Sequence, residues 1–249
     1  MLHRAAYAAL GLDREYGLHD ITEETLPEFV AGLDATWAGL SLTMPLKQAV
    51  IPLLTDLDLL ARVTGAVNTV VIDDDGLHGW NTDVHGIVAC LDEQVAPSGT
   101  GAVVGAGATA RSAVAALARR GTTEVVVVAR RPEAASLVLE TAREVGVRVE
   151  VVGWESLVDA LEADVVVSTV PRGVMDAAAV EVAADGGPRG CLLDVVYDPW
   201  PTRLAAAWSG AGGQVASGLD MLLHQAVRQV ELMTGLTPPL EAMRAALSS

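Results

Sequence analysis

The stretch that decides the fold runs from Thr100 to Ala110 and reads Thr-Gly-Ala-Val-Val-Gly-Ala-Gly-Ala-Thr-Ala. Gly101–Val104 is a short apolar run that predicts a buried strand, and a helix-like stretch follows the last residues. Between them lies Gly105-x-Gly107-x-x-Ala110, the turn that dinucleotide-binding folds place between a strand and a helix. The first glycine permits the tight turn, the second lets the backbone approach a pyrophosphate, and free N–H groups open the helix. Tight turns also use glycine structurally, but this context favours a dinucleotide site.

Strands and helices alternate outward from this turn. A continuous β-branched run such as Val125–Val128 is typical of a strand buried on both faces. The expected strands are Gly101–Val104, Val125–Ala129, Arg148–Val152, Asp164–Ser168 and Cys191–Val196. The expected helices are a stretch ending at Arg120 and capped by Gly121, then Pro132–Val145 and Trp154–Leu161. This alternation predicts an α/β fold with a parallel, doubly wound sheet.

The first hundred residues also read as α/β, with a less regular pattern. The expected helices are Leu2–Leu10, Glu24–Leu33, one starting near Pro45–Lys47, and Val84–Val95. The expected strands are Tyr16–Ile21, Ala38–Thr43, and a hairpin of Thr69–Ile72 and Leu77–Trp80. Asp73–Gly76 supplies the hairpin turn, and its three carboxylates suit a solvated turn better than a metal site. Ala96–Gly99 marks a domain boundary, and the chain is helical again after Gly218.

Composition narrows the classes of partner. The chain has 249 residues, 51% of them hydrophobic, and a formal net charge of −16. Such a charge argues against nucleic acid, which needs clustered Lys and Arg, and the apolar runs are too short for a membrane helix. The start, from Met1 to Leu12, has the period of an amphipathic helix rather than of a signal peptide. Cys90 and Cys191 form no metal or disulfide motif, so we expect a cytoplasmic protein without a metal site.

The cofactor is indicated by the end of the second strand, Ala129-Arg130-Arg131. NAD-binding folds usually carry an Asp or Glu there for the ribose hydroxyls. Two guanidiniums would instead attract a 2′-phosphate and hydrogen-bond it in a planar fork. The alternative is a pair of solvated arginines at a helix start, where the dipole disfavours positive charge. The sequence favours NADP over NAD.

Lys47 is the only lysine, whereas the other 15 basic residues are arginine. A position that keeps lysine can require a compact ammonium with a movable proton, although chance in a GC-biased genome is the alternative. Lys47 lies in Ser41–Lys47, one of three patterns that put short polar side chains at strand ends, with Gly65–Thr69 and Gly79–Asp83. Because α/β folds form their clefts at such ends, these patterns call for a common explanation.

Taken together, these motifs resemble the shikimate dehydrogenase family, in matching order from residue 2 to about residue 235. The resemblance implies a substrate-binding and catalytic domain of residues 1–97 with 218–249, and a Rossmann NADP-binding domain of residues 98–217. It also implies NADPH-dependent, reversible reduction of 3-dehydroshikimate to shikimate. Lys47 would be the acid/base residue that protonates the developing alkoxide, and Asp83 would be its catalytic partner.

The resemblance assigns further residues by motif. Substrate would be bound by Thr43, Asn68, Tyr197 and Gln225. NADP would be bound by Gly105, Ala106, Gly107, Ala108, Thr109, Arg130, Arg131, Ser168, Thr169, Val170, Gly218 and Met221. The expected partner is the small-molecule substrate, without nucleic acid or membrane. The oligomeric state stays open, a homodimer being one option.

The chain departs from the family pattern in two places. Ser41 stands where the family usually has asparagine. The family also begins with a strand and a Ser-x-Ser-x-Pro loop that holds the substrate carboxylate, and this sequence starts just after that loop. We therefore expect the natural N-terminus to lie upstream, and we expect residues 1–249 to bind NADPH but to turn over shikimate poorly. The alternatives are an NAD-dependent relative acting on quinate or another cyclitol, and a non-catalytic NADP-binding protein.

Overall fold

The computed structural model describes residues 1–184 and 190–247, with side chains at 183 and 184 left aside. The chain divides into two compact units, Met1–Gly86 with Leu223–Ser249, and Ile87–Leu222. The divisions fall inside two helices, α5 (Thr82–Asp92) and α11 (Gly218–Thr234). In the part of the chain that is described, no helix has the length and hydropathy that a membrane crossing requires.

The unit Ile87–Leu222 is built on a six-stranded sheet in the order β10-β9-β8-β5-β6-β7. Every pairing in it is parallel, which confirms the doubly wound sheet. The strands are β5 (Thr100–Val104), β6 (Glu124–Val128), β7 (Arg148–Val152), β8 (Val165–Ser168), β9 (Cys191–Asp194) and β10 (Gln214–Ser217). Because β5 pairs with β6 on one side and with β8 on the other, the strand order reverses at β5. Ligands of doubly wound sheets bind at the carboxyl ends of the strands at such a reversal.

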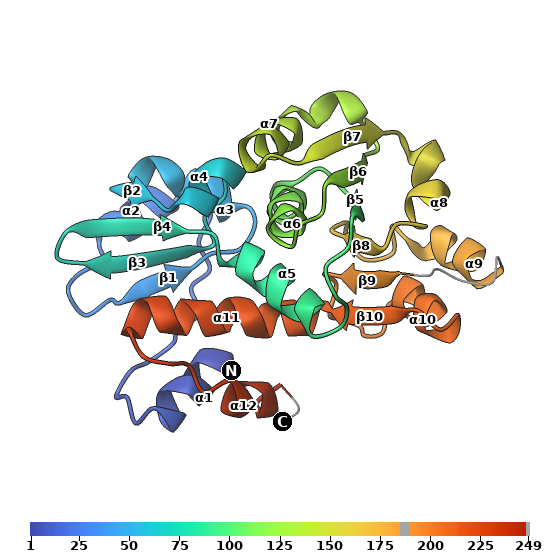
Figure 1. The fold of residues 1–249 in the computed structure, drawn as a ribbon. Coiled ribbons are helices and arrows are strands. Elements are labelled where there is room, and N and C mark those ends of the chain that lie inside the picture. Colours follow the sequence, from blue (N-terminus) through green and yellow to red (C-terminus); the bar gives the residue numbers. More distant parts are fainter. Residues whose placement is uncertain (185–189, 248–249) are drawn as a thin grey trace. The chain divides into compact units, whose positions relative to one another are not determined.

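Helices cover both faces of this sheet (Figure 1). The helices α6 (Ala108–Arg119) and α7 (Ser136–Val145) lie on one face. On the other face are α8 (Leu157–Ala160), α9 (Asp176–Ala184) and α10 (Arg203–Gly210). Trp208 of α10 is fully buried in the core of that second face, and its Nε1–H donates to the Gly190 carbonyl at 3.0 Å. Short 3-10 turns, η2 (Pro132–Ala134) and η3 (Trp154–Ser156), precede α7 and α8.

The unit Met1–Gly86 with Leu223–Ser249 contains a four-stranded sheet in the order β1-β3-β4-β2. Its strands are β1 (Gly39–Ser41), β2 (Asp56–Leu57), β3 (Thr69–Asp73) and β4 (Gly76–Trp80). The antiparallel pair of β3 and β4 confirms the predicted hairpin. At its turn the Asp73 carboxylate accepts the backbone N–H groups of Asp75 and Gly76, and Gly76 has a φ of 135°.

Short helices surround this sheet. They are α1 (Leu2–Ala9), α2 (Leu26–Ala31), α3 (Leu46–Ala49), α4 (Leu59–Thr64) and α12 (Leu240–Ala245), with a 3-10 turn η1 (Ile51–Leu53). The helices α1 and α12 pack against each other (Figure 1). Leu26, Val30, Val50 and Val67 belong to the apolar cluster that holds α2, α3 and the sheet together. That cluster fixes α3, and with it Lys47, relative to the hairpin.

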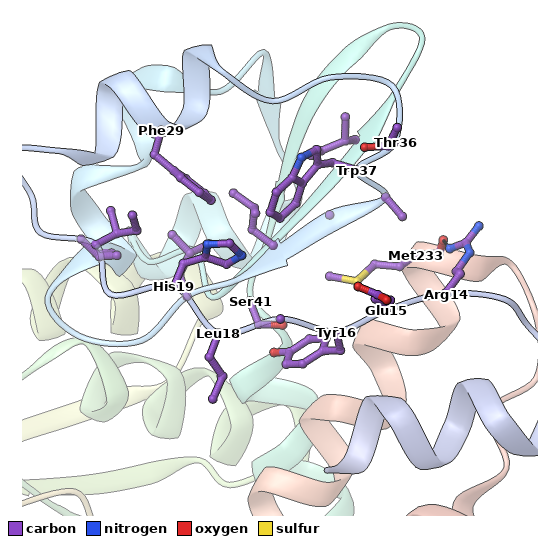
Figure 2. A pocket seen from close by; sticks show the side chains of 18 of the residues that line it. Arg14, Glu15, Tyr16, Leu18, His19, Phe29, Thr36, Trp37, Ser41 and Met233 are labelled. Carbon is purple, nitrogen blue, oxygen red and sulfur yellow. Dashed lines mark hydrogen bonds between the residues drawn. The ribbon is translucent and has the colours of Figure 1, made fainter.

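The predicted strand Tyr16–Ile21 is wrong, because this segment is irregular in the structure. A cavity of about 1020 Å³ is lined by Asp13–His19 and Ile21, and also by β1 and its flanking residues (Figure 2). The segment therefore has no ladder partner at β1. Its Tyr16 carbonyl instead accepts two hydrogen bonds from the Arg4 guanidinium, at 3.0 and 2.8 Å.

Candidate active site

Lys47 forms a close ion pair with Asp83. The Lys47 Nζ lies 2.6 Å from Asp83 Oδ2, and the side chains are 14% and 3% exposed. Lys47 is the second residue of α3, whose N-cap is Pro45. Asp83 lies in the first turn of α5, where the helix dipole favours a carboxylate. Asp83 is the hydrogen-bond partner of Lys47 among the described residues, so two of the three ammonium donors stay available to a ligand. The Lys47 ammonium is thus more accessible to a ligand than the buried Asp83 carboxylate.

Asn68, which precedes β3, holds the other oxygen of that carboxylate. Its Nδ2 donates to Asp83 Oδ1 at 2.7 Å and to Gln225 Oε1 at 3.0 Å. Its Oδ1 accepts the backbone N–H of Thr82 at 2.8 Å and the hydroxyl of Thr69 at 2.9 Å. Because donors surround Oδ1 and acceptors surround Nδ2, the amide has one favoured orientation. The structure thus brings Lys47, Asn68, Asp83 and Gln225 into one hydrogen-bonded group.

Three further residues extend this hydrogen-bonded group and were not predicted as site residues. Thr69 and Thr82 lie inside the quoted motifs, and both are almost fully buried around the Asn68 amide. Gln229 lies one helical turn after Gln225 on α11, and its Nε2 donates to Thr69 Oγ1 at 3.0 Å. That spacing of four residues on one helix was the available signal for Gln229.

Ser41 and Thr43 lie beside the cavity shown in Figure 2. Ser41 ends β1, and its Oγ lies 3.1 Å from Gln229 Oε1, to which it donates. Thr43 follows two residues later, with an exposed side chain, and both residues line the cavity. Arg14, Tyr16, His19 and Trp37 contribute polar and aromatic side chains to the same cavity.

His3 of α1 is a buried histidine in the same unit. Its ring stacks on Tyr16, with centroids 4.0 Å apart and an interplanar angle of 10°. Burial lowers the pKa of His3 to about 4, while the side chain of Gln229 acts in the opposite direction. His3 is therefore neutral in the folded protein at pH 7.

The glycine-rich turn lies at the strand reversal of the other unit. Gly105 has a φ of 114°, and a β-carbon there would collide with Thr169 Oγ1. The Thr169 hydroxyl donates to the Val104 carbonyl at 2.8 Å, so Ser168–Val170 packs directly against the turn. Gly107 is the N-cap of α6, and a β-carbon there would meet no atom within 4 Å in the described structure. Open space thus lies at the start of α6, where the helix dipole and the first N–H groups favour an anion.

Arg130 and Arg131 follow β6 after one residue, Ala129, and are exposed. Val128 at the end of β6 is in register with Val104 at the end of β5, so both arginines leave the sheet beside the glycine turn. Within residues 1–184 and 190–247 neither guanidinium forms an ion pair, so both stay available to an anion.

The remaining predicted residues lie after β8, after β9 and on α11. Ser168 ends β8 and is buried, Tyr197 follows β9 and is half exposed, and Met221 of α11 is buried. Gly218 opens α11 so close to the Val195 carbonyl that a β-carbon would collide with it. Thus Ser168, Tyr197, Gly218 and Met221 belong to the unit of the glycine turn, whereas Lys47, Asn68, Asp83 and Gln225 belong to the other.

These features define a class. A doubly wound sheet with a glycine turn at its strand reversal suits a dinucleotide. A lysine–carboxylate pair with free ammonium donors suits proton transfer to a substrate oxygen. The combination is that of a dinucleotide-dependent oxidoreductase acting on a carbonyl or hydroxyl group.

Comparisons with known proteins define the family. Residues 1–70 match the model of the shikimate dehydrogenase substrate binding domain, and residues 218–247 match that of the shikimate 5'-dehydrogenase C-terminal domain. Residues 100–196 match a model described as NADP oxidoreductase, coenzyme F420-dependent. The shikimate dehydrogenase (NADP(+)) of Oleidesulfovibrio alaskensis is 35% identical over 100% of this chain and 89% of its own length.

Solved structures of similar proteins point to the same family. The Mycobacterium tuberculosis shikimate dehydrogenase is 42% identical, with a TM-score of 0.89 over 99% of this chain and 92% of that one. The Thermus thermophilus shikimate 5-dehydrogenase, solved with NADP(H) and shikimate, is 31% identical, with a TM-score of 0.83 over 99% and 92% of the two chains. The chain belongs to the shikimate dehydrogenase family.

Proposed function

We propose that this protein is an NADP-dependent shikimate dehydrogenase that reversibly reduces 3-dehydroshikimate to shikimate. The observation that carries the proposal is the 2.6 Å contact between Lys47 Nζ and Asp83 Oδ2, held by Asn68 and Gln225. The relatives named above carry the same activity in their names. Guanidinium could not replace Lys47 as a proton donor, which accounts for the one lysine among 16 basic residues.

In the proposed mechanism, Lys47 and Asp83 handle the proton. NADPH, when bound, supplies the hydride for the carbonyl carbon of the ring ketone. As the carbonyl oxygen gains charge, the Lys47 ammonium donates a proton to it, and the product is the hydroxyl of shikimate. Asp83 holds the ammonium in place, while Asn68, Gln225, Thr43 and Tyr197 bind the substrate's hydroxyl groups. In the reverse direction neutral Lys47 removes the hydroxyl proton.

The residues of the glycine turn fit NADP. Gly105–Thr109 offers a turn that only glycine tolerates at its first position, and open space at its N-cap. Ser168–Val170, Gly218 and Met221 complete the proposed cofactor site. Arg130 and Arg131 would hold the 2′-phosphate, since both are exposed beside the turn. The proposed NADP-binding domain is residues 98–217, and the proposed substrate-binding and catalytic domain is residues 1–97 with 218–249.

Location and assembly are further proposals. Both cysteines, Cys90 and Cys191, are free and buried, which supports a reducing compartment such as the cytoplasm. A homodimer is the proposal for self-association, and sedimentation velocity tests it.

A panel of four assays tests the proposed function. Purified protein is mixed with shikimate or quinate and with NADP⁺ or NAD⁺, and the absorbance of the reduced nicotinamide is followed. We expect the highest kcat/KM for shikimate with NADP⁺. Preference for quinate with NAD⁺ would identify the cyclitol dehydrogenase alternative. Binding of NADPH without turnover of either substrate would identify a non-catalytic NADP-binding protein.

A further inference from the structure

Gln229 is hydrogen-bonded to residues next to Lys47 and Asp83, but it contacts neither of these two directly. It lies on α11, one turn after Gln225, and only 3% of it is exposed. Besides its interaction with the buried His3, its amide makes three contacts that point in defined directions. The Nε2 donates to Thr69 Oγ1 at 3.0 Å and approaches the Asn68 carbonyl at 3.5 Å, and the Oε1 accepts from Ser41 Oγ at 3.1 Å.

The contact with Thr69 decides where the hydroxyl proton of Thr69 points. A hydroxyl has one proton to donate and can accept two hydrogen bonds. Because the Gln229 N–H occupies an acceptor position, the Thr69 proton points to Asn68 Oδ1 at 2.9 Å or to Thr82 Oγ1 at 3.1 Å. The Thr82 hydroxyl itself donates to Asn68 Oδ1 at 3.1 Å, so both routes end on the same amide oxygen. These bonds, together with the N–H of Thr82, turn the Asn68 Nδ2 toward Asp83 Oδ1. Each hydrogen bond in this chain is therefore donated in the direction from Gln229 toward the Asp83 carboxylate, which holds Lys47.

Burial makes this chain of hydrogen bonds depend on Gln229. Thr69 is fully buried and Asn68 is 2% exposed, so water has little access to replace a lost donor. A buried polar group that loses its partner carries the cost of its desolvation in the folded state. The Asn68 amide would then lose its single favoured orientation.

We propose that Gln229 is a positioning residue for the reaction, acting through Thr69 on the Asn68 amide and so on Asp83 and Lys47. The Ser41 contact extends this role to the end of β1, so that Gln229 ties β1, β3 and α11 together at the site. Ser41 lies at the cavity of Figure 2, next to Leu42 and Thr43. The inference rests on the proposed function for its kinetic readout.

The kinetic test uses Gln229→Met, which keeps the length and volume of the side chain and removes its hydrogen bonds. We expect kcat for shikimate to fall about tenfold, with the NADPH Kd within about twofold, and the pH profile of kcat/KM to shift. A tenfold change corresponds to about 1.4 kcal/mol of transition-state stabilisation. Thr69→Val should cause a similar loss, and the double variant should lose no more than either single one, because both interrupt one chain.

Val230→Ala is the matched control, since Val230 is fully buried on the same helix and makes no side-chain hydrogen bond. It should lower Tm without changing kcat or the pH profile. If Gln229→Met also lowers Tm and leaves kcat within twofold, or if its loss adds to that of Thr69→Val, Gln229 is merely structural and the inference fails.

A crystal structure of Gln229→Met decides the matter without turnover. We expect the Asn68 Nδ2 to lie farther than 3.5 Å from Asp83 Oδ1, or the amide to occupy two orientations. An Asn68 amide that keeps its 2.7 Å contact would overturn the inference. An inactive parent protein would instead count against the proposed function, and the crystal structure would still test Gln229.

Discussion

Replacing Asp83 by asparagine should destabilise the protein more than the loss of an ordinary ion pair. Asp83 Oδ2 faces the Lys47 ammonium at 2.6 Å and Oδ1 faces the Asn68 Nδ2 at 2.7 Å, so both oxygens accept from donors. In Asp83→Asn one of these positions becomes an NH₂ group. In either orientation of the new amide, a donor meets a donor.

The cost can be sized from the burial of the pair. Removing one partner of a buried ion pair typically costs about 3–5 kcal/mol. Lys47 keeps 14% of its side chain exposed, so its ammonium regains some hydration and the lower end applies. We therefore expect Asp83→Asn to lower the free energy of unfolding by about 3 kcal/mol. Against a usual total of about 5–15 kcal/mol, the variant still folds.

Urea unfolding at pH 7 measures this loss. Asp176→Asn is the control, because the side chains of Arg203 and Asp176 are 76% and 45% exposed and their charged atoms lie 3.5 Å apart. Their pair should contribute less than about 1 kcal/mol. In Lys47→Met/Asp83→Asn the new amide can turn its oxygen to Asn68 without opposing an ammonium. The double variant should thus lose clearly less than the sum of the single losses. A loss as small as that of Asp176→Asn, or simple additivity, would refute this reasoning.

Three further predictions concern the cofactor site and the buried histidine. Arg130→Asp should raise the NADPH Kd and narrow or reverse the NADPH/NADH ratio of kcat/KM, through loss of one charge-assisted contact and a new repulsion; an unchanged ratio would contradict a 2′-phosphate role. Gly105→Ala should weaken NADPH binding by roughly tenfold or more in a fluorescence titration, whereas Gly146→Ala, also at positive φ but with open space around it, should leave binding unchanged. The pKa of His3 lies near 4 in the folded protein and near 6.5 in the unfolded chain, so its stabilising effect is present above pH 6.5 and is lost as the pH falls toward 4, by about 3 kcal/mol. His3→Phe should flatten this acid loss in urea unfolding at pH 7 and 4.5, and an equal loss in parent and variant would show that His3 is not responsible.

The strands of the doubly wound sheet could be predicted from sequence because their signal is local. Continuous apolar runs such as Val125–Val128 leave few alternatives to a buried strand. The strand β10 (Gln214–Ser217) was not predicted, since four residues after a glycine pair carry little pattern. The prediction of a strand at Tyr16–Ile21 was wrong for the opposite reason. Its residues suit a strand, but a strand also needs a hydrogen-bonded partner, and among the described residues β1 pairs with β3 and with no other strand.

In the candidate site, too, some residues could be predicted from sequence and others could not. Lys47, Asn68 and Asp83 lie in short motifs at strand ends, so the sequence alone indicated them as candidate site residues. Gln229 carries no motif, and its one sequence signal, the spacing of four residues from Gln225, does not separate a site residue from a solvent-exposed one. Its role depends on the packing of α11 against β3, a contact between residues 160 positions apart. Only the fold reveals such contacts.

The central claim is that Lys47 donates and accepts the proton in an NADP-dependent reaction. The most direct measurement is the kcat of Lys47→Arg with shikimate and NADP⁺, alongside the NADPH Kd of the same variant. Arginine keeps the positive charge beside Asp83 and cannot give up a proton at working pH. We predict that kcat falls by about 10²–10⁴ while the Kd stays within about twofold. Near-normal turnover of Lys47→Arg would contradict the claim.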